Sequence, residues 1–546
     1  MSLAMALWTA VATVVAAVPP PLLLLLSSLL PPTSIAFYRL YLSPLSHIPG
    51  PPFACMSSLF LYSICYWGIE GRVLLYYHQK YNTPVLRIAP NSVSLSSPDA
   101  LHSVYIASGG LPKDARYENF RVEGHDTIFS TRDPAYRDAR AKAVLPLFAP
   151  SRIRASCESG ICGKLIDEFV DALRAQREEA LLDRSGSGTR SRKIDILDLS
   201  SRLSIDVLTG YLFDKTYGGL EEKGRGKACN ISNGDGDHEG DGNQWTQKLS
   251  ATPFVLAIVA FSRFSLLPSW LFSLVFPLLM RPTLSKPDVA ASLATVSRYV
   301  DSIAGADTSN TDTNKDTNTY QSRLLRADIS HKETLIQCKA AMFAGADSTA
   351  VMLSTILFHL VRRPDVRKRL KEELRRRQAG AGVDYQSLPY LQAVIREGLR
   401  LGMANPARLT RIVPPQSIGY TVSGVFLPPK TIVGAAAYVF HHDAGVFPRP
   451  FEFLPERWLG SAATGDETGP GTGLRRLKES DMFPYGLGSR ACLGRNLANQ
   501  QLYTTVAKVI ESDVLDGAVT CTDRIELVEW FNAEIKGHVL EIQWQE

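Results

Sequence analysis

Hydrophobic residues recur at helical spacing along most of the chain, and they alternate with polar residues in short stretches near its beginning. The alternation predicts two strands, at 85–88 and 93–95. Long helical patterns follow at 135–182 and 194–212. The clearest helix is predicted over 333–362 and ends before a proline. The chain is therefore predicted to be mainly α with a smaller β region.

This last helix carries polar residues in its middle. Ser330 and Glu333 form a capping-box pattern at its start. Further on, Asp347, Ser348 and Thr349 interrupt an otherwise apolar sequence. Buried polar groups cost free energy unless they have partners or a task. One interpretation is a kinked helix whose hydroxyls bond back to its own carbonyls, and the other is a functional site.

The amino-terminal segment is apolar and contains no charge before Arg39. We predict a membrane anchor at 1–35, although the three prolines at 19–21 interrupt its helical pattern. Positive charge follows the segment, so the bulk of the chain is expected on the cytosolic side. A cleavable signal peptide is the alternative, but the basic start that it needs is missing. A proline-rich hinge is predicted at 36–52.

Composition narrows the class of protein only slightly. The 546 residues suffice for one large domain or several. A net charge of +5 with 21% charged residues does not indicate a nucleic-acid partner. The eight cysteines form no CxxC pair, which favours a reducing compartment. Three segments rich in small polar residues are predicted to be exposed insertions: 185–192, 219–243 and 304–319.

The most informative residue is Cys492, in the glycine-spaced loop 483–494. Its glycines let the backbone approach a flat cofactor, and Arg490 places positive charge beside the sulfur. A helix is predicted directly after the loop, and its amino-terminal amides stabilise a thiolate. A thiolate is a ligand for haem iron. A buried structural cysteine is the alternative.

The loop resembles the haem-binding loop of the cytochrome P450 superfamily, Phe-x-x-Gly-x-Arg-x-Cys-x-Gly. Gly488, Arg490, Cys492 and Gly494 match this pattern, and Tyr485 stands where the pattern has Phe. The resemblance implies haem b, with Cys492 as the axial ligand of the iron. It also implies the cytochrome P450 fold, a single large haem-enclosing domain, here at 53–546.

The helix at 333–362 is similar to the oxygen-binding helix of that family. Ser348 occupies the usual threonine position, keeping the hydroxyl but losing the methyl that restricts rotamers. The resemblance implies that Ser348 binds oxygen and passes protons. It further implies that Asp347 relays protons from solvent. Thr349, one residue on, is a second candidate for the hydroxyl role.

Further motifs of the family stand in the expected order. Glu397 and Arg400, three residues apart, match its Glu-x-x-Arg pair, and Arg457 supplies the second arginine of a structural triad. For the haem carboxylates, the resemblance implies Arg411 and Arg140, with Tyr replacing the family's Trp four residues before Arg140. Either arginine alone is also consistent with a solvated surface charge.

The implied activity is insertion of one oxygen atom from dioxygen into a lipophilic small molecule. The resemblance implies that the electrons come from a partner, NADPH–cytochrome P450 reductase, with cytochrome b5 as a further donor. It also implies that the protein is located at the endoplasmic reticulum membrane. The segment 87–93 looks like filamentous-fungal members near trichodiene oxygenase, which tailor secondary metabolites such as terpenoids and polyketides. The alternatives are a haem-thiolate isomerase or dehydratase that needs no reductase, and a non-catalytic haem-binding protein. Pocket candidates, by position, are Phe120, Phe129, Phe343, Ala344, Met403, Ala404 and Phe531.

Overall fold

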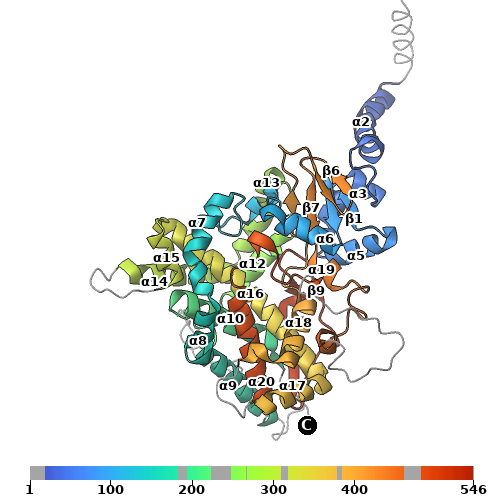
Figure 1. Ribbon diagram of the computed structural model, residues 1–546. Coiled ribbons are helices and arrows are strands. Elements are labelled where there is room, and N and C mark those ends of the chain that lie inside the picture. The colour runs from blue at the N-terminus through green and yellow to red at the C-terminus, as the bar shows by residue number, and fades with distance from the viewer. Residues whose placement is uncertain are drawn as a thin grey trace, which may run out of the picture.

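The computed structural model describes residues 19–182, 193–222, 248–265, 267–308, 318–377, 384–459 and 481–544. Helices form most of this part of the chain, and short strands form four small sheets. The prediction of a mainly α protein with a smaller β region is confirmed. In Figure 1 the helices fill one side of the molecule, and the largest sheet lies on the other side with the amino-terminal elements.

The helix α16 (His331–Arg362) runs through the centre of the helical side. It packs against α10 (Ile196–Phe213), α18 (Pro389–Gly402) and α20 (Arg495–Glu511). The hydroxyl of Ser330 accepts a hydrogen bond from the Glu333 amide at the start of the helix. The helix ends at Arg362, two residues before Pro364. The predicted helix at 333–362 is therefore confirmed and starts two residues earlier.

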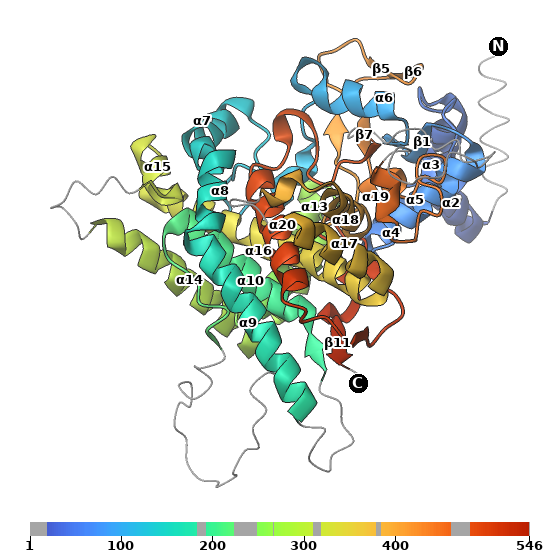
Figure 2. The same ribbon diagram turned by 60° about the horizontal axis from the view of Figure 1, so that its bottom comes forward.

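Most of the remaining helices lie around this centre, and those from the amino-terminal part of the chain lie beside the largest sheet (Figure 2). The stretch predicted as helical over 135–182 is divided in three, because Pro150 and Gly160 interrupt it. Those three helices are α7 (Pro134–Val144), α8 (Pro150–Glu158) and α9 (Ile161–Leu182). The others are α3 (Pro52–Met56), α4 (Leu59–Tyr66), α5 (Glu70–Tyr81), α6 (Pro98–Leu101), α12 (Thr252–Ser262), α13 (Ser269–Leu284), α14 (Pro287–Thr308), α15 (Tyr320–Arg326), α17 (Pro364–Arg377) and α19 (Ala437–His441).

The largest sheet has the order β1-β2-β7-β4. Its antiparallel hairpin, β1 (Val85–Ala89) and β2 (Ser92–Leu95), matches the predicted strands. β2 pairs in parallel with β7 (Ile432–Ala435). β4 (Arg411–Ile412) pairs antiparallel with β7 and forms the other end of the sheet. The small sheets are β3 (Ile194–Asp195) with β11 (Glu541–Trp544) and β8 (Ala518–Thr520), β5 (Tyr420–Val422) with β6 (Val425–Leu427), and β9 (Leu527–Val528) with β10 (Glu534–Ile535).

The predicted insertions lie mostly outside the described residues. This applies to 185–192, to 223–243 and to 309–317. Where the third segment is described, it begins inside a helix, because α14 continues to Thr308. In the second segment, the Gly219 amide donates to the buried carboxylate of Asp206 at 2.8 Å, so its first residues are tied to α10.

At the amino terminus, α2 (Pro20–Phe37) begins directly after Pro19 and stands away from the body of the molecule in Figure 1. Residues 1–18 of the predicted anchor lie outside the described residues. Among the residues that the structure describes, one helix passes a length-and-hydropathy test for a membrane span. That helix is α16, whose most apolar stretch is 72% buried inside the domain.

Candidate active site

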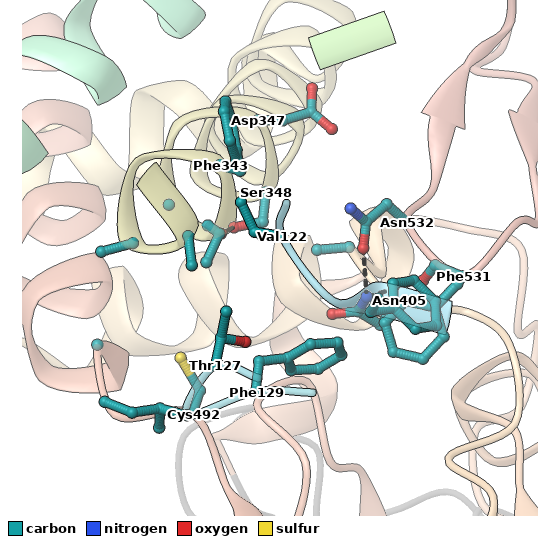
Figure 3. A pocket seen from close by; sticks show the side chains of 18 of the residues that line it. Val122, Thr127, Phe129, Phe343, Asp347, Ser348, Asn405, Cys492, Phe531 and Asn532 are labelled. Atoms are coloured by element: carbon teal, nitrogen blue, oxygen red, sulfur yellow. Dashed lines mark hydrogen bonds between the residues drawn. The ribbon is translucent and has the colours of Figure 1, made fainter. Parts of the chain in front are cut away.

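A large cavity of about 1040 Å3 lies between α16 and the loop before α20. Phenylalanine rings form much of its wall, and in Figure 3 Cys492 lies on one side with Asp347 and Ser348 above it. Of the predicted pocket positions, Met403 is wrong, because it lies buried at the end of α18 and does not line the cavity. The other six line it: Phe120, Phe129, Phe343, Ala344, Ala404 and Phe531.

The loop 483–494 places the sulfur of Cys492 at the cavity wall. The Cys492 amide donates to the carbonyl oxygen of Tyr485 at 2.9 Å, which closes the loop on itself. Gly488 has a positive φ of 67° and packs so closely on the Tyr105 carbonyl that a Cβ would collide with it. A side chain at Gly494 would begin 3.9 Å from the Cys492 sulfur, so glycine keeps that side open.

The accessible surface of Cys492 faces the cavity, and dense protein surrounds the rest of the residue. This burial raises the pKa of the thiol, while the amides of Gly494 and Arg495 donate to the sulfur and oppose the rise. Both amides belong to the start of α20, as predicted from the sequence. Such amides favour a thiolate once a positively charged partner offsets the cost of burial.

Positive side chains gather beside this loop. Lys113, Arg137 and Arg490 line the cavity, and Arg411 lies close enough to lower the pKa of both Lys113 and Arg490, after burial as the largest cause. Within the described residues, Lys113, Arg411 and Arg490 form no ion pair with a carboxylate. A buried cluster of unpaired cations is unfavourable without an anion.

These residues fit a haem group. A cysteine sulfur with amide donors suits the iron, an open glycine loop suits a flat ring, and the cations suit two carboxylates. Lys113 also lies over the rings of Tyr117 and Phe129, at 4.1 and 4.4 Å, so its position is fixed. Sequence reasoning did not identify Lys113 or Arg137, because neither stands in a motif of recognisable spacing.

Arg140 has a different environment from the one that the resemblance implied. Its guanidinium forms two hydrogen bonds to Glu333, at 2.5 and 3.0 Å, and lies 3.4 Å over the ring of Tyr136. The cavity lining includes Arg137 and not Arg140. Glu333, on the facing α16, is thus the partner of Arg140 in this structure, and the assignment of Arg140 to the haem carboxylates stays a prediction.

The polar residues of α16 reach the cavity. Asp347, Ser348 and Thr349 all line it, and α16 continues unbroken through them. The Ser348 hydroxyl donates to the carbonyl oxygen of Ala344 at 2.8 Å, as in the back-bonded interpretation. This bond uses the hydroxyl hydrogen and leaves the oxygen able to accept another hydrogen bond.

Asp347 is the titratable group of this helix. It is 8% exposed, and burial, followed by the nearby charge of Glu534, raises its pKa to about 7. Glu534 lies on β10, and burial raises its own pKa as well. A carboxyl group with a pKa near neutrality can both give and take a proton at physiological pH.

The three residues of the predicted triad meet in the core. Both carboxylate oxygens of Glu397 bond to Arg400, at 2.8 and 2.9 Å, and Arg457 donates to one of them at 3.0 Å. Two further donors were not predicted, the Trp458 indole at 2.9 Å and the Leu454 amide at 3.0 Å. Arg400 also donates to three backbone carbonyls of the segment 441–452. The triad thus fixes the chain that leads to the cysteine loop.

His441 connects this triad to the cysteine loop. It is fully buried, and burial lowers its pKa to about 3, so the ring is neutral. Its Nε2 accepts from the Phe483 amide at 3.2 Å, so Nδ1 must carry the hydrogen that bonds to the Arg400 carbonyl at 3.1 Å. No motif pointed to His441, because both of its partners are distant in sequence.

A cysteine loop facing a large cavity, cations beside it and a buried carboxylate–arginine triad together define a haem-thiolate protein. The family model "Cytochrome P450" matches residues 48–512, and the chain belongs to this family. The resemblance drawn from the motifs is therefore confirmed, and family membership implies a haem-thiolate iron cofactor.

Three similar proteins come from fungi. The chain is 48% identical to cytochrome P450 monooxygenase mfmF of Annulohypoxylon moriforme, over 93% of this chain and 96% of the relative. It is 27% identical to cytochrome P450 monooxygenase BOT1 of Botryotinia fuckeliana, over 92% and 91%. It is 28% identical to fusicoccadiene C-8 hydroxylase of Alternaria brassicicola, over 87% and 85%. The chain is thus a cytochrome P450 monooxygenase.

Proposed function

We propose that this monooxygenase inserts one oxygen atom from dioxygen into a lipophilic fungal secondary metabolite of terpenoid or polyketide type. The observation that carries the proposal is the cavity of about 1040 Å3 with a wall of phenylalanine rings, open to Cys492. Apolar cavities with few polar groups bind apolar ligands. The name of one relative specifies hydroxylation of fusicoccadiene, which supports a terpenoid.

The residues around the cysteine loop hold the cofactor in this proposal. Cys492 would hold the iron of haem b through its sulfur. Lys113, Arg137 and Arg490, which line the cavity, and Arg411, which lies close to Lys113 and Arg490, would hold its carboxylates. The haem, when bound, supplies the iron at which dioxygen is activated. Gly494 leaves room for its ring beside the sulfur, while Gly488 fixes the shape of the loop by packing on the Tyr105 carbonyl. Tyr485 packs beside the ring, and its hydroxyl donates to Asn499 at 2.6 Å.

Asp347 and Ser348 deliver protons in this proposal. The Asp347 carboxyl, with a pKa of about 7, releases a proton into the cavity and recovers one from solvent on the side where Glu534 lies. The Ser348 oxygen, whose hydrogen is held by the Ala344 carbonyl, accepts and passes protons. Thr349, which is buried beside the cavity, is the second candidate for this role.

Electron supply and location complete the proposal. Electrons come from NADPH–cytochrome P450 reductase, with cytochrome b5 as a further donor. Residues 1–35 anchor the enzyme in the endoplasmic reticulum membrane, 36–52 form the hinge, and 53–546 form the cytosolic domain. Exposed Leu30 and Ile35 on α2, and Trp270 and Leu274 on α13, support contact with a lipid surface.

The test is deletion of the gene from its host, followed by mass spectrometry of the accumulated compound. That compound is then supplied to microsomes that contain the enzyme and a fungal reductase. A product heavier by one oxygen atom, formed only with NADPH, supports the proposal. A product of unchanged mass, formed without NADPH, would instead establish the isomerase alternative, and a product lighter by one water the dehydratase. No product under either condition would favour a haem-binding protein.

A further inference from the structure

Two asparagines from distant segments lie side by side in the aromatic wall of the cavity. Asn405 follows α18, and Asn532 lies in the turn between β9 and β10. The Ala533 amide donates to the Ala404 carbonyl at 2.9 Å, which sets the two segments in register. In Figure 3 the pair lies on the side of the cavity away from Cys492.

The hydrogen bonds fix which amide atoms face the cavity. The side-chain nitrogen of Asn405 donates to the carbonyl oxygen of Phe531 at 2.7 Å, and a carbonyl can only accept. The same nitrogen lies 3.0 Å from Asn532, which must therefore present its oxygen to it. The two atoms that remain are the Oδ1 acceptor of Asn405 and the Nδ2 donor of Asn532. Neither has a partner within the described part of the chain.

Other amide side chains of the cavity wall already use their nitrogen in hydrogen bonds within the protein. Gln337 accepts from the Ile128 amide and donates to the Asp126 carbonyl. Asn119 uses its nitrogen to hold the carbonyl of Ser265 at 2.9 Å. The Asn405–Asn532 pair differs from them because it offers a donor and an acceptor next to each other.

The turn that carries Asn532 is held in place on its far side. The carboxylate of Glu529 bonds to the side chain and the amide of Arg72, at 2.5 and 3.0 Å. The indole of Trp530 donates to the Tyr66 carbonyl at 3.1 Å, and Phe531 packs on Phe120 with ring centroids 4.7 Å apart. The amide pair is therefore positioned before any ligand arrives, which reduces the entropy that binding costs.

We propose that this amide pair binds a hydroxyl or carbonyl oxygen of the substrate, while the rest of the substrate lies among the aromatic rings. The Asn532 nitrogen donates to that oxygen, and the Asn405 oxygen accepts from its hydrogen when the group is a hydroxyl. The substrate is then an already oxygenated lipophilic molecule. A reaction that introduces oxygen precedes this enzyme. The inference rests on the proposed function, and it names the class of substrate for the same cavity.

The test measures binding and needs no turnover. Haem-loaded full-length protein in detergent is equilibrated with two matched sets of probes: decalin, decalol and decalone, and androstane, androstanol and androstanone. Within each set the skeleton stays constant and only the oxygen function changes. We expect the alcohol and the ketone to bind roughly tenfold more tightly than the hydrocarbon, because an unfilled donor in an apolar wall is unfavourable.

Variants of Asn532 separate recognition from folding. Asn532→Asp keeps the oxygen that accepts from Asn405 and turns the outward atom from a donor into an acceptor. It should lose the preference for the ketone and keep the preference for the alcohol. Asn532→Leu should lose the preference for the ketone and keep only the part of the alcohol preference that the Asn405 oxygen provides. Asn91→Asp, on the exposed turn between β1 and β2, is the matched control and should behave like the parent protein.

Equal affinity of the parent protein for hydrocarbon, alcohol and ketone would overturn the inference. An unchanged ketone preference in Asn532→Asp and Asn532→Leu would overturn it as well. Its failure is distinct from failure of the proposed function. If the affinities depend on the amide pair but no oxygenated product forms, the inference about binding holds and the proposed function fails. If an oxygenated product forms but the affinities do not depend on the pair, the proposed function holds and the inference fails.

Discussion

Replacement of His441 by leucine should weaken the link between the triad and the cysteine loop. Leucine fills a similar space but leaves the Phe483 amide and the Arg400 carbonyl without a partner in a fully buried place. Each orphaned backbone group costs about 1–3 kcal/mol, so the free energy of unfolding should fall by roughly 2–6 kcal/mol. Domains are stable by about 5–15 kcal/mol, so the variant should still fold.

The assay combines urea unfolding with the rate at which haem leaves the protein. His442→Leu is the matched control. His442 is also buried and bonds the Tyr438 carbonyl at 3.1 Å, but within the described part of the chain its ring makes no hydrogen bond to the cysteine loop. We expect both variants to be less stable and only His441→Leu to lose haem faster. His441→Gln, whose amide offers one donor and one acceptor, should recover part of the haem retention. Equal haem loss in His441→Leu and His442→Leu would refute the positioning role.

Three further outcomes follow from the buried charges and the helix hydroxyl. Glu397→Gln leaves the buried Arg400 cation without its carboxylate, so stability should fall by about 3–5 kcal/mol in urea unfolding; a loss below about 1 kcal/mol would contradict the triad's role. Burial lowers the pKa of His78 and His359 to about 4, below the unfolded value of about 6.5. The unfolded chain then binds more protons as pH falls through this window, so thermal stability should decline from about pH 6.5 towards pH 4. A flat profile in Asp347→Asn, which removes the opposing titration of the buried Asp347 carboxyl, would show that these imidazoles do not stay neutral. Ser348→Ala should divert electrons to peroxide with little change in substrate affinity, measured as product formed per NADPH oxidised. Asp347→Asn should slow turnover about tenfold or more, measured as product formed per enzyme per minute. Normal coupling in Ser348→Ala would move the hydroxyl role to Thr349.

Local signals predicted the elements that local chemistry decides. Ser330 and Pro364 allowed the start and the end of α16 to be predicted, because helix capping and the missing amide hydrogen of proline act within a single turn of the chain. Glycine spacing identified the loop around Cys492 because the backbone itself must adopt left-handed φ values there. The division of 135–182 was also visible in the sequence, at Pro150, but helical period alone hid it.

The rest depended on contacts between distant segments. Glu333 looked like a capping-box residue, but its carboxylate turns to Arg140, almost two hundred residues away along the chain. That pairing removes Arg140 from the cavity and leaves Arg137 in it. Lys113 joins the same cationic group from another segment, and no spacing rule connects them. Partners of this kind become predictable only when the fold is known.

The most direct test of the account is the carbon monoxide spectrum of the reduced protein, measured for the parent and for Cys492→Ser. Thiolate ligation from the loop 483–494 predicts a strongly red-shifted Soret band in the parent protein. Replacement of the sulfur by a hydroxyl should abolish that band, even in protein that has folded and taken up haem. A red-shifted band that persists in folded, haem-loaded Cys492→Ser would contradict the central claim that Cys492 is the iron ligand.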